Sequence, residues 1–394
     1  MGYFFTIEAM QIFDYIIAHY GWAGTTLIAL LLILFFIQIY YHAVRYGNIA
    51  KYKNSKRKKR LNDAPPISVV IPLMSEDFGF IHERLPRFLQ QRYEPGYELV
   101  IIFIGTNGDF YEELEAMRLQ YSNLRISKLE YNPRFPISPK QAINLGIKSS
   151  MNNHIIISAA NVTPSSDEWL AMMGKGFMRG EIVLGYTAIE QNAGLGSYMI
   201  RMSRMQTAMY WLADAVKGKI YNSSRSNFGL TKSVYFEANG FSHLNMNIGE
   251  NDLFLAKVAR RKNTSIVMTP KATVDERQWG GLSWWIAQLR YYGSASHLYP
   301  QWARNGVEWD LRSHILFFLV ALAALIFMPL EVKIATALLL LIRFAVALHN
   351  AKAVAKRLGE RAIGARYILF DIFHPLMMLY LRIKLIHKDP SAWK

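Results

Sequence analysis

The segment "HIIISAA" (154–160) decides the fold, because it is a short, continuous apolar run that ends in small, neutral residues. Three other runs have the same character: "ISVVIP" (67–72), "YELVIIFIG" (97–105) and "EIVLGYTAI" (181–189). Such runs are typical of strands buried on both faces of a mostly parallel sheet. Helix-like stretches alternate with them, at 81–92, 110–121 and 140–151. The alternation predicts a doubly wound α/β domain at about 65–280, with ligands at the carboxyl ends of its strands.

An uncharged stretch from Gly21 to Val44 precedes this domain. At about 1.5 Å per residue it is long enough to cross a bilayer core of roughly 30 Å, so a transmembrane helix is favoured over a buried globular helix. The segment before it, 1–20, contains Glu8 and Asp14 but no Lys or Arg, so it does not resemble a signal peptide. We expect 1–20 to form a separate amphipathic segment.

A second apolar block follows the domain at 313–349 and predicts a transmembrane helical hairpin. Arg343 lies inside this block, and we expect its long side chain to reach the membrane interface. The block is flanked by an amphipathic interfacial region at 281–312. After it, 350–394 is predicted to hold a basic loop (350–366) and an interfacial helix (367–388) that is too polar for a span.

The formal net charge of +16 is largely a property of membrane-flanking segments. The linker at 45–64 contains "KYKNSKRKKR" (51–60), and the loop at 350–366 is also basic. The positive-inside rule places both segments and the α/β domain in the cytoplasm and the N-terminus outside, with anionic lipids as partners. Membrane topology accounts for the charge and no stacking or groove-reading motif is present, so nucleic acid is not an expected partner. The chain has no cysteine, which excludes disulfides and thiolate metal sites.

Residues 67–280 resemble the family 2 glycosyltransferases, inverting enzymes with the GT-A fold that transfer a sugar from a nucleotide donor. Four stretches carry the resemblance in order: "SVVIP" with Glu76 behind it, "KQAINLGI" (140–147), "NFGLTKSVYFEANGF" (227–241) and "GENDLFLAKVA" (249–259). The resemblance implies a multi-pass protein of the bacterial inner membrane. It also implies a nucleotide-sugar donor and an envelope glycan or lipid-linked acceptor.

The resemblance also shows where acidic motifs are degenerate. Family members hold Mg²⁺ or Mn²⁺ with an Asp-x-Asp motif, whose two acids fall here on Ala159 and Asn161. Neither residue supplies the anionic oxygen that these hard cations prefer, so no metal ligand is assigned. The acidic pair that binds the nucleotide falls on Phe103 and Ile104, with Asp109 a few residues further on.

Several residues remain candidates for substrate binding on the family pattern. On the donor side they are Glu76, Asp109, Lys140 and Asn161. On the acceptor side they are Asn227, Gln288 and Arg290. The last two belong to "WWIAQLRYY" (284–292), where Arg290 is one place out of register with the family's Gln-x-x-Arg-Trp element. This stretch also fits an aromatic interfacial helix.

The catalytic base of an inverting transferase is a carboxylate within hydrogen-bond reach of the acceptor hydroxyl. Glu250 and Asp252 in "GENDLF" are the candidates. On a helix they would diverge by about 200°, so we expect only one of them to face the site. The alternative is that both acids favour the first turn of a helix at 251–261 through its dipole.

Six basic residues lie near the predicted donor cleft, namely Arg201, Arg204, Lys217, Lys219, Arg225 and Lys232. They are interpreted either as cations that replace the metal at a diphosphate or, with more weight, as a basic face on anionic lipid. Two functions therefore stay open. The chain is a membrane glycosyltransferase without the conventional metal site, or it is an inactive pseudo-glycosyltransferase that acts as a scaffold or regulatory subunit of a membrane complex. The loss of four acids favours the second.

Overall fold

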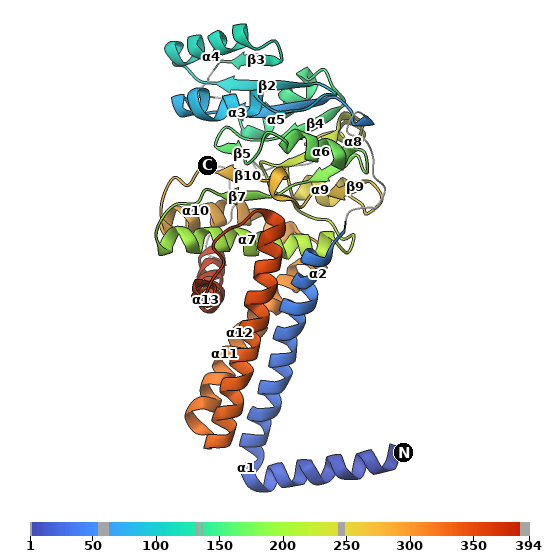
Figure 1. Cartoon of the computed structure of the whole chain (residues 1–394), viewed down its shortest axis with the longest axis vertical. Coiled ribbons are helices and arrows are strands. Elements are labelled where there is room, and N and C mark those ends of the chain that lie inside the picture. Colours follow the sequence, from blue (N-terminus) through green and yellow to red (C-terminus); the bar gives the residue numbers. More distant parts are fainter. Residues whose placement is uncertain (1, 54–62, 131–133, 135–136, 243–248, 387–394) are drawn as a thin grey trace.

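The protein has an α/β domain at one end and a bundle of long helices that extends away from it (Figure 1). The computed structural model describes residues 2–53, 63–130, 134, 137–242 and 249–386. Two helices, α7 (Leu195–Ala215) and α10 (Leu282–Gly293), lie between the domain and the bundle (Figure 1). The α/β domain and the helical bundle therefore meet at these two helices.

The larger sheet of the described residues has seven strands in the order β3-β2-β1-β4-β8-β6-β9. Their bounds are Leu124–Leu129 (β3), Tyr97–Ile104 (β2), Ile67–Leu73 (β1), His154–Ile157 (β4), Phe228–Thr231 (β8), Ile182–Leu184 (β6) and Thr264–Ile266 (β9). Pairing is parallel except at β8, which runs antiparallel to β4 and β6. The predicted α/β fold with a mostly parallel sheet is confirmed.

A smaller sheet contains β5 (Val162–Pro164), β10 (Val274–Glu276) and β7 (Thr187–Ile189), in that order. The prediction of one strand at 181–189 is wrong, because β6 and β7 belong to different sheets. The chain leaves the first sheet at Gly185, where an added Cβ would lie 2.7 Å from the side chain of Asn227. Glycine permits this close approach, and the strand is interrupted there.

Both faces of the larger sheet are buried, as the continuous apolar strands predict. Val70 of β1 packs in one hydrophobic cluster, while its neighbours Val69 and Ile71 pack in the other.

The helices of the domain are η3 (Phe80–Arg84, π-helical), α3 (Leu85–Leu89), α4 (Gly108–Gln120), α5 (Pro139–Ser149), α6 (Trp169–Phe177), α8 (Lys232–Glu237), α9 (Leu253–Val258) and the short η4 (Pro270–Ala272). The helix predicted at 251–261 is thus shorter than expected.

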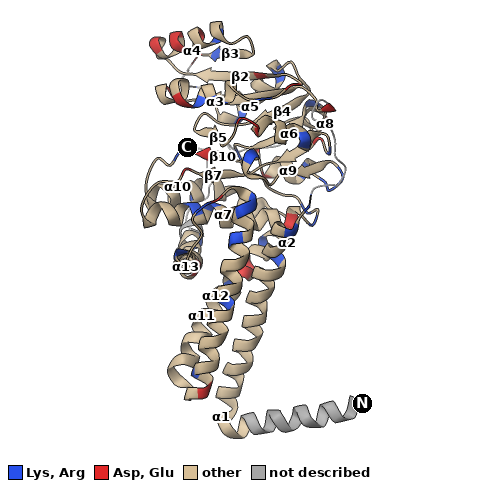
Figure 2. Cartoon of the chain, viewed as in Figure 1, with Lys and Arg blue, Asp and Glu red and all other residues tan. Residues whose placement is uncertain are grey.

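Three segments of the described chain are helical, long and apolar enough to cross a membrane: 17–51, 301–327 and 330–358. The first combines α1 (Gly2–Ile39), a π-helical turn η1 (Tyr40–Tyr46) and α2 (Gly47–Lys51). Gly21, with φ 67°, bends α1 at the start of the uncharged stretch. Most of this first membrane-spanning candidate carries no charged residue (Figure 2). The expectation for 1–20 rests mainly on side chains outside the described part.

The other two long helices are α11 (Gln301–Phe327) and α12 (Leu330–Leu358), preceded by η5 (Ser294–Leu298). The boundary predicted at residue 313 falls inside α11. The basic loop predicted at 350–366 is wrong over its first half, because α12 continues to Leu358 and Gly359 caps it with φ 82°. Residues 54–60 of the first basic run lie outside the described part.

The last helix, α13 (Arg366–Ile386), lies beside the bundle below α7 (Figure 1). The expectation that Arg343 reaches the membrane interface is wrong. Its side chain has no exposed surface and pairs with Asp371 of α13. An arginine in an apolar helix is therefore accommodated by an internal partner rather than by solvent.

Candidate active site

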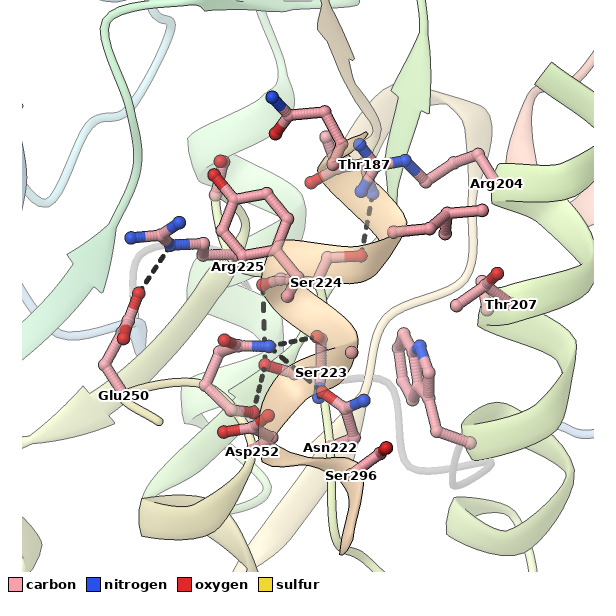
Figure 3. Close-up of a pocket in the computed structure, with 18 of the residues that line it drawn as sticks. Thr187, Arg204, Thr207, Asn222, Ser223, Ser224, Arg225, Glu250, Asp252 and Ser296 are labelled. Carbon is pink, nitrogen blue, oxygen red and sulfur yellow. Dashed lines mark hydrogen bonds and ion pairs between the residues drawn. The ribbon is translucent and has the colours of Figure 1, made fainter. Parts of the chain in front are cut away.

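A cavity of about 900 Å³ lies at the carboxyl ends of β1 and β4. Residues following these strands, such as Ser75 and Ala159, form one part of its wall. Helices α7, α10, α11 and α13 form another part. In Figure 3, Arg204 and Thr207 of α7 lie on one side of the cavity, and Arg225 and Glu250 lie on the other. The cavity is therefore where a doubly wound fold binds ligands, and it also reaches the helical bundle.

The tip of β4 holds the two positions at which the resemblance implies metal-binding acids. Ala159 and Asn161 both line the cavity. The side-chain amide of Asn161 donates a hydrogen bond to Glu276 Oε1 at 3.2 Å, and the backbone carbonyl of Asn161 accepts one from the backbone N–H of Arg277 at 2.9 Å. Glu276 Oε2 pairs with Arg204 of α7. The carboxylate beside the tip is thus already bound to a cationic side chain.

These residues do not fit a divalent metal. No group of three His, Cys, Asp or Glu side chains that could hold a metal ion occurs among the described residues. Ala159 has no ligand atom, and Asn161 offers a neutral oxygen. Mg²⁺ and Mn²⁺ prefer several anionic oxygens, which this tip does not provide.

Glu250 is a buried carboxylate in the cavity wall, with 1% of its side chain exposed. Its Oε1 lies 2.5 Å from Nε of Arg225, and the Arg225 guanidinium stacks 4.6 Å from the ring centre of Tyr292. Glu250 Oε2 has no hydrogen-bond partner among the described residues. One oxygen of this carboxylate is held by Arg225, and the other is buried without a partner among the described residues.

Asp252 also lines the cavity, so the expectation that only one of the two acids faces the site is wrong. The reason is that Glu250 and Asp252 precede α9 instead of lying on it. Asp252 caps α9 by accepting from the backbone N–H of Leu253 (2.6 Å), and it accepts from the Tyr299 hydroxyl (2.6 Å). Burial raises the pKa of Asp252 to about 6, against the opposing effect of these hydrogen bonds. Since both oxygens are engaged, Asp252 is less suited than Glu250 to accept a proton.

The segment "NSSRS" (222–226) supports the two acids and also lines the cavity, although the sequence alone points only to Arg225 within it. The amide of Asn251 donates to the Ser223 carbonyl at 2.8 Å and to Asn222 Oδ1 at 3.0 Å. Ser224 Oγ accepts from the backbone N–H of Thr187 at 3.0 Å. The clustered Ser and Asn residues were the available signal, since such residues bind nearby backbone groups in turns.

Three of the four predicted donor-side residues do not line the cavity. Glu76 accepts hydrogen bonds from the backbone N–H groups of Thr106 (2.5 Å) and Asn107 (2.7 Å), so it shapes the loop after β2. Asp109 is exposed in the first turn of α4. Lys140 lies in the first turn of α5, where burial lowers its pKa and the charge of Glu250 opposes this effect. Of the predicted donor-side residues, the structure brings Asn161 alone to the cavity.

Asn227 is a structural residue and does not line the cavity, contrary to its expected acceptor-side role. It is fully buried, and its amide donates to the carbonyls of Tyr186 and Ala272, both at 2.8 Å. Its Oδ1 accepts from Trp169 Nε1 at 3.1 Å. Asn227 therefore connects the segment after Gly185 to α6 and to the end of η4.

Helix α10 contributes Gln288 to the cavity but not Arg290. The side chain of Trp285, on the same helix, is buried, lines the cavity and donates to Ser203 Oγ of α7 at 2.9 Å. The helix is therefore fastened to α7. The interpretation of 284–292 as part of the site is compatible with Gln288, whereas Arg290 lies outside the wall.

The six basic residues do not form one lipid-facing surface, so that interpretation is wrong. Arg201 and Glu360 form a buried ion pair at 2.7 Å. Lys232 donates to the Ser150 carbonyl, and Lys219 lies 5.5 Å from the ring centre of Trp302. Of the six, Arg204 and Arg225 line the cavity. Arg304 of α11 and Arg382 of α13 also line it, so a ligand there would meet four arginines.

Comparisons with protein-family models and with curated proteins gave no match. The fold is similar to that of the mannosyltransferase PcManGT from Pyrobaculum calidifontis, solved in complex with GDP-Man and Mn²⁺. The TM-score is 0.59 and the identity 13%, and the match covers 92% of this chain and 99% of that chain. At this identity the likeness shows the fold alone. The chain therefore has a glycosyltransferase-like α/β fold, accompanied by three helices suited to membrane association.

Proposed function

We propose that this protein is a membrane-bound, family 2-like glycosyltransferase that transfers a sugar from a nucleotide donor to an envelope glycan or a lipid-linked acceptor. The observation that carries the proposal is Glu250, whose buried carboxylate lines the cavity at the strand ends and has a free Oε2 among the described contacts. Such a carboxylate can take the proton of an acceptor hydroxyl. The fold supports sugar transfer as a class, and the site supports the reaction.

In the proposed reaction the acceptor hydroxyl oxygen attacks the anomeric carbon of the donor sugar. Glu250 takes the hydroxyl proton as the new C–O bond forms. The bond from the anomeric carbon to the diphosphate oxygen breaks, and the nucleoside diphosphate leaves with the electron pair. Attack opposite the leaving group inverts the configuration. Arg225 holds Glu250 Oε1 in place during these steps.

The cavity wall supports an acceptor that arrives from the bilayer. Val307 of α11 and the apolar side chains of Met378 and Leu381 of α13 line it. Basic residues lie at the domain-proximal ends of the long helices, as Lys51 does in α2 and Lys356 in α12. By the positive-inside rule we assign the α/β domain to the cytoplasmic side of a bacterial inner membrane, with the N-terminus outside.

A second candidate function is a non-catalytic scaffold or regulatory subunit of a membrane complex. It is favoured by the replacement of the metal-binding acids by Ala159 and Asn161. At the positions of the nucleotide-binding acids, Phe103 and Ile104 are both buried in the hydrophobic core. These side chains cannot contact a nucleotide without rearrangement of the sheet.

The two functions are separated by assaying the full chain in lipid nanodiscs against a panel of nucleotide sugars, with and without Mn²⁺. We expect transfer or slow donor hydrolysis that falls by about 10²-fold or more in Glu250→Gln. Asp252→Asn is the matched control and should retain more activity, because Asp252 is already bound to Leu253 and Tyr299. A folded wild-type protein without turnover under any condition would instead support the non-catalytic function.

A further inference from the structure

We propose that Arg204 forms a cationic site for the diphosphate group of a nucleotide at the tip of β4, where the resemblance implies a metal ion. The proposal rests on the proposed function for the identity of the ligand. It is carried by three observations: the side chains that connect Arg204 to the strand tip, the donors that Arg204 has left, and the engagement of the neighbouring cations elsewhere.

The first observation is a continuous chain of polar contacts. Asn161, which stands at the second metal-acid position, donates to Glu276 Oε1 at 3.2 Å, and Glu276 Oε2 pairs with Arg204 Nη2. Glu276 lies at the end of β10, opposite Val162 in the strand register, directly after the β4 tip. One carboxylate therefore holds a positive charge of α7 beside the place where a metal would bind the diphosphate.

The second observation is that Arg204 still has a donor to offer. Its side chain is 22% exposed and lines the cavity. Nη2 is bound to Glu276, Nε is buried, and Nη1 has no hydrogen-bond acceptor among the described residues. The guanidinium carbon lies 5.0 Å from the ring centre of Trp285, which restricts the plane of the group. The N–H donors of Nη1 are therefore available for charge-assisted hydrogen bonds to phosphate oxygens.

The third observation concerns the other cations, which have partners of their own. Arg304 and Arg382, the arginines that α11 and α13 contribute to the cavity, pair with Gln301 and Glu308. Arg225 is held by Glu250 and Tyr292. Arg201, one helical turn before Arg204, is buried against Glu360 and does not line the cavity. Lys232 is bound to a backbone carbonyl of the segment before β4. Among the cavity-lining arginines, Arg204 is thus the one whose partner, Glu276, is bound to the strand tip.

The chemistry of the ligand agrees with this placement. A diphosphate is anionic in the ground state, and its charge increases as the bond to the sugar breaks. A fixed cation in a cavity of low polarity stabilises such charge more strongly than one in water. Glu276 acts as a positioning residue, because its contacts to Arg204 and Asn161 set where the guanidinium lies.

The test is isothermal titration of the full chain in nanodiscs with UDP, GDP, ADP and inorganic pyrophosphate, in one series with EDTA and in a second with Mn²⁺. We expect at least one of these probes to bind, and Arg204→Gln to weaken it by about tenfold to a hundredfold. Arg204→Lys keeps the charge without the planar fork and should weaken binding by a smaller factor. Lys217→Gln removes an exposed charge just beyond the end of α7 and should leave the affinity unchanged.

Thermal unfolding verifies that each variant is folded. The proposal is overturned if wild type binds none of the probes, if it binds them only with Mn²⁺, or if Arg204→Gln binds as tightly as wild type. If Arg204→Gln does not fold, equal affinities of Arg204→Lys and wild type overturn it. A protein that binds a diphosphate through Arg204 but transfers no sugar would refute the proposed enzyme and leave this site standing.

Discussion

Arg343 of α12 and Asp371 of α13 form an ion pair whose side chains are 0% and 4% exposed. The same guanidinium lies 3.0 Å from Gln38 Oε1 and 2.7 Å from His314 Nε2. One buried cation thus joins α1, α11, α12 and α13. Because α13 supplies part of the cavity wall, this pair also determines how that wall is placed.

Arg343→Met should lower the free energy of unfolding by about 3–5 kcal/mol, since it leaves Asp371 buried without a counter-charge. The double variant Arg343→Met, Asp371→Leu should be more stable than this single variant, because neither charge remains. Arg382→Met, which removes a partly exposed arginine of α13, is the control and should cost about 0–1 kcal/mol. Thermal unfolding in nanodiscs measures all three, and equal losses in the single and double Arg343 variants would contradict the prediction.

Gly146→Ala should destabilise the domain by about 1–3 kcal/mol through overpacking. An added Cβ at Gly146 of α5 would lie 2.3 Å from Val70 Cγ1 of β1, so the helix would have to move away from the sheet. Gly108→Ala, at the start of α4 with no atom within 4 Å of the added Cβ, should be neutral or slightly stabilising. A melting temperature that falls equally in both variants would refute the overpacking mechanism.

Asn227→Ala should cost at least about 1–3 kcal/mol, because it leaves buried groups such as Trp169 Nε1 without a partner. Ligand affinity of the folded fraction should stay close to wild type, since Asn227 does not line the cavity. Asn305→Ala, at an exposed position on α11, is the control. Unfolding curves and nucleotide titrations test both halves. A stable variant with lost nucleotide binding would contradict the structural role and show that Asn227 contributes to the ligand site.

Asp252→Asn should stabilise the protein above pH 6 and lose this advantage toward pH 4. The folded pKa of Asp252 is raised to about 6, so the folded state holds its proton more tightly than the unfolded chain does. The stability that the protonated Asp252 carboxyl gives the wild type is therefore lost as the pH rises from about 4 to 6. Above pH 6 the contribution of this group to the free energy of unfolding no longer changes with pH. The difference is at most about 3 kcal/mol. Melting temperatures of both proteins across this range provide the measurement, and a constant difference would exclude the mechanism.

The strands could be predicted where they are buried on both faces, as at 67–72 and 97–105, because a short, continuous apolar run between turn residues is typical of such strands. The interval 181–189 has the same composition, yet it crosses between two sheets. What breaks it is the approach of Asn227 to Gly185, a contact between residues 42 positions apart that no local pattern reveals. Local sequence predicts strand character but not the sheet to which a strand belongs.

The acidic residues of the candidate site could be predicted from the sequence, whereas the ion-pair partners of its arginines could not. Glu250 and Asp252 follow from a motif, whereas the helix expected for them would place only one in the site. The partners of Arg204 and Arg343 come from β10 and α13, far along the chain. Ion pairs of this kind depend on tertiary packing, so neither Glu276 nor Asp371 could be assigned to them from the sequence.

The wall that the cavity shares with the long helices has a practical consequence for biochemistry. A soluble fragment that ends before α11 would lose Val307, Met378 and Leu381 from this wall and would also expose α7 to water. The cavity would then be open to solvent on the side that α11 and α13 now cover. If such a fragment failed to bind a nucleotide, the missing wall would be a sufficient cause. Binding assays should therefore use all 394 residues in a bilayer.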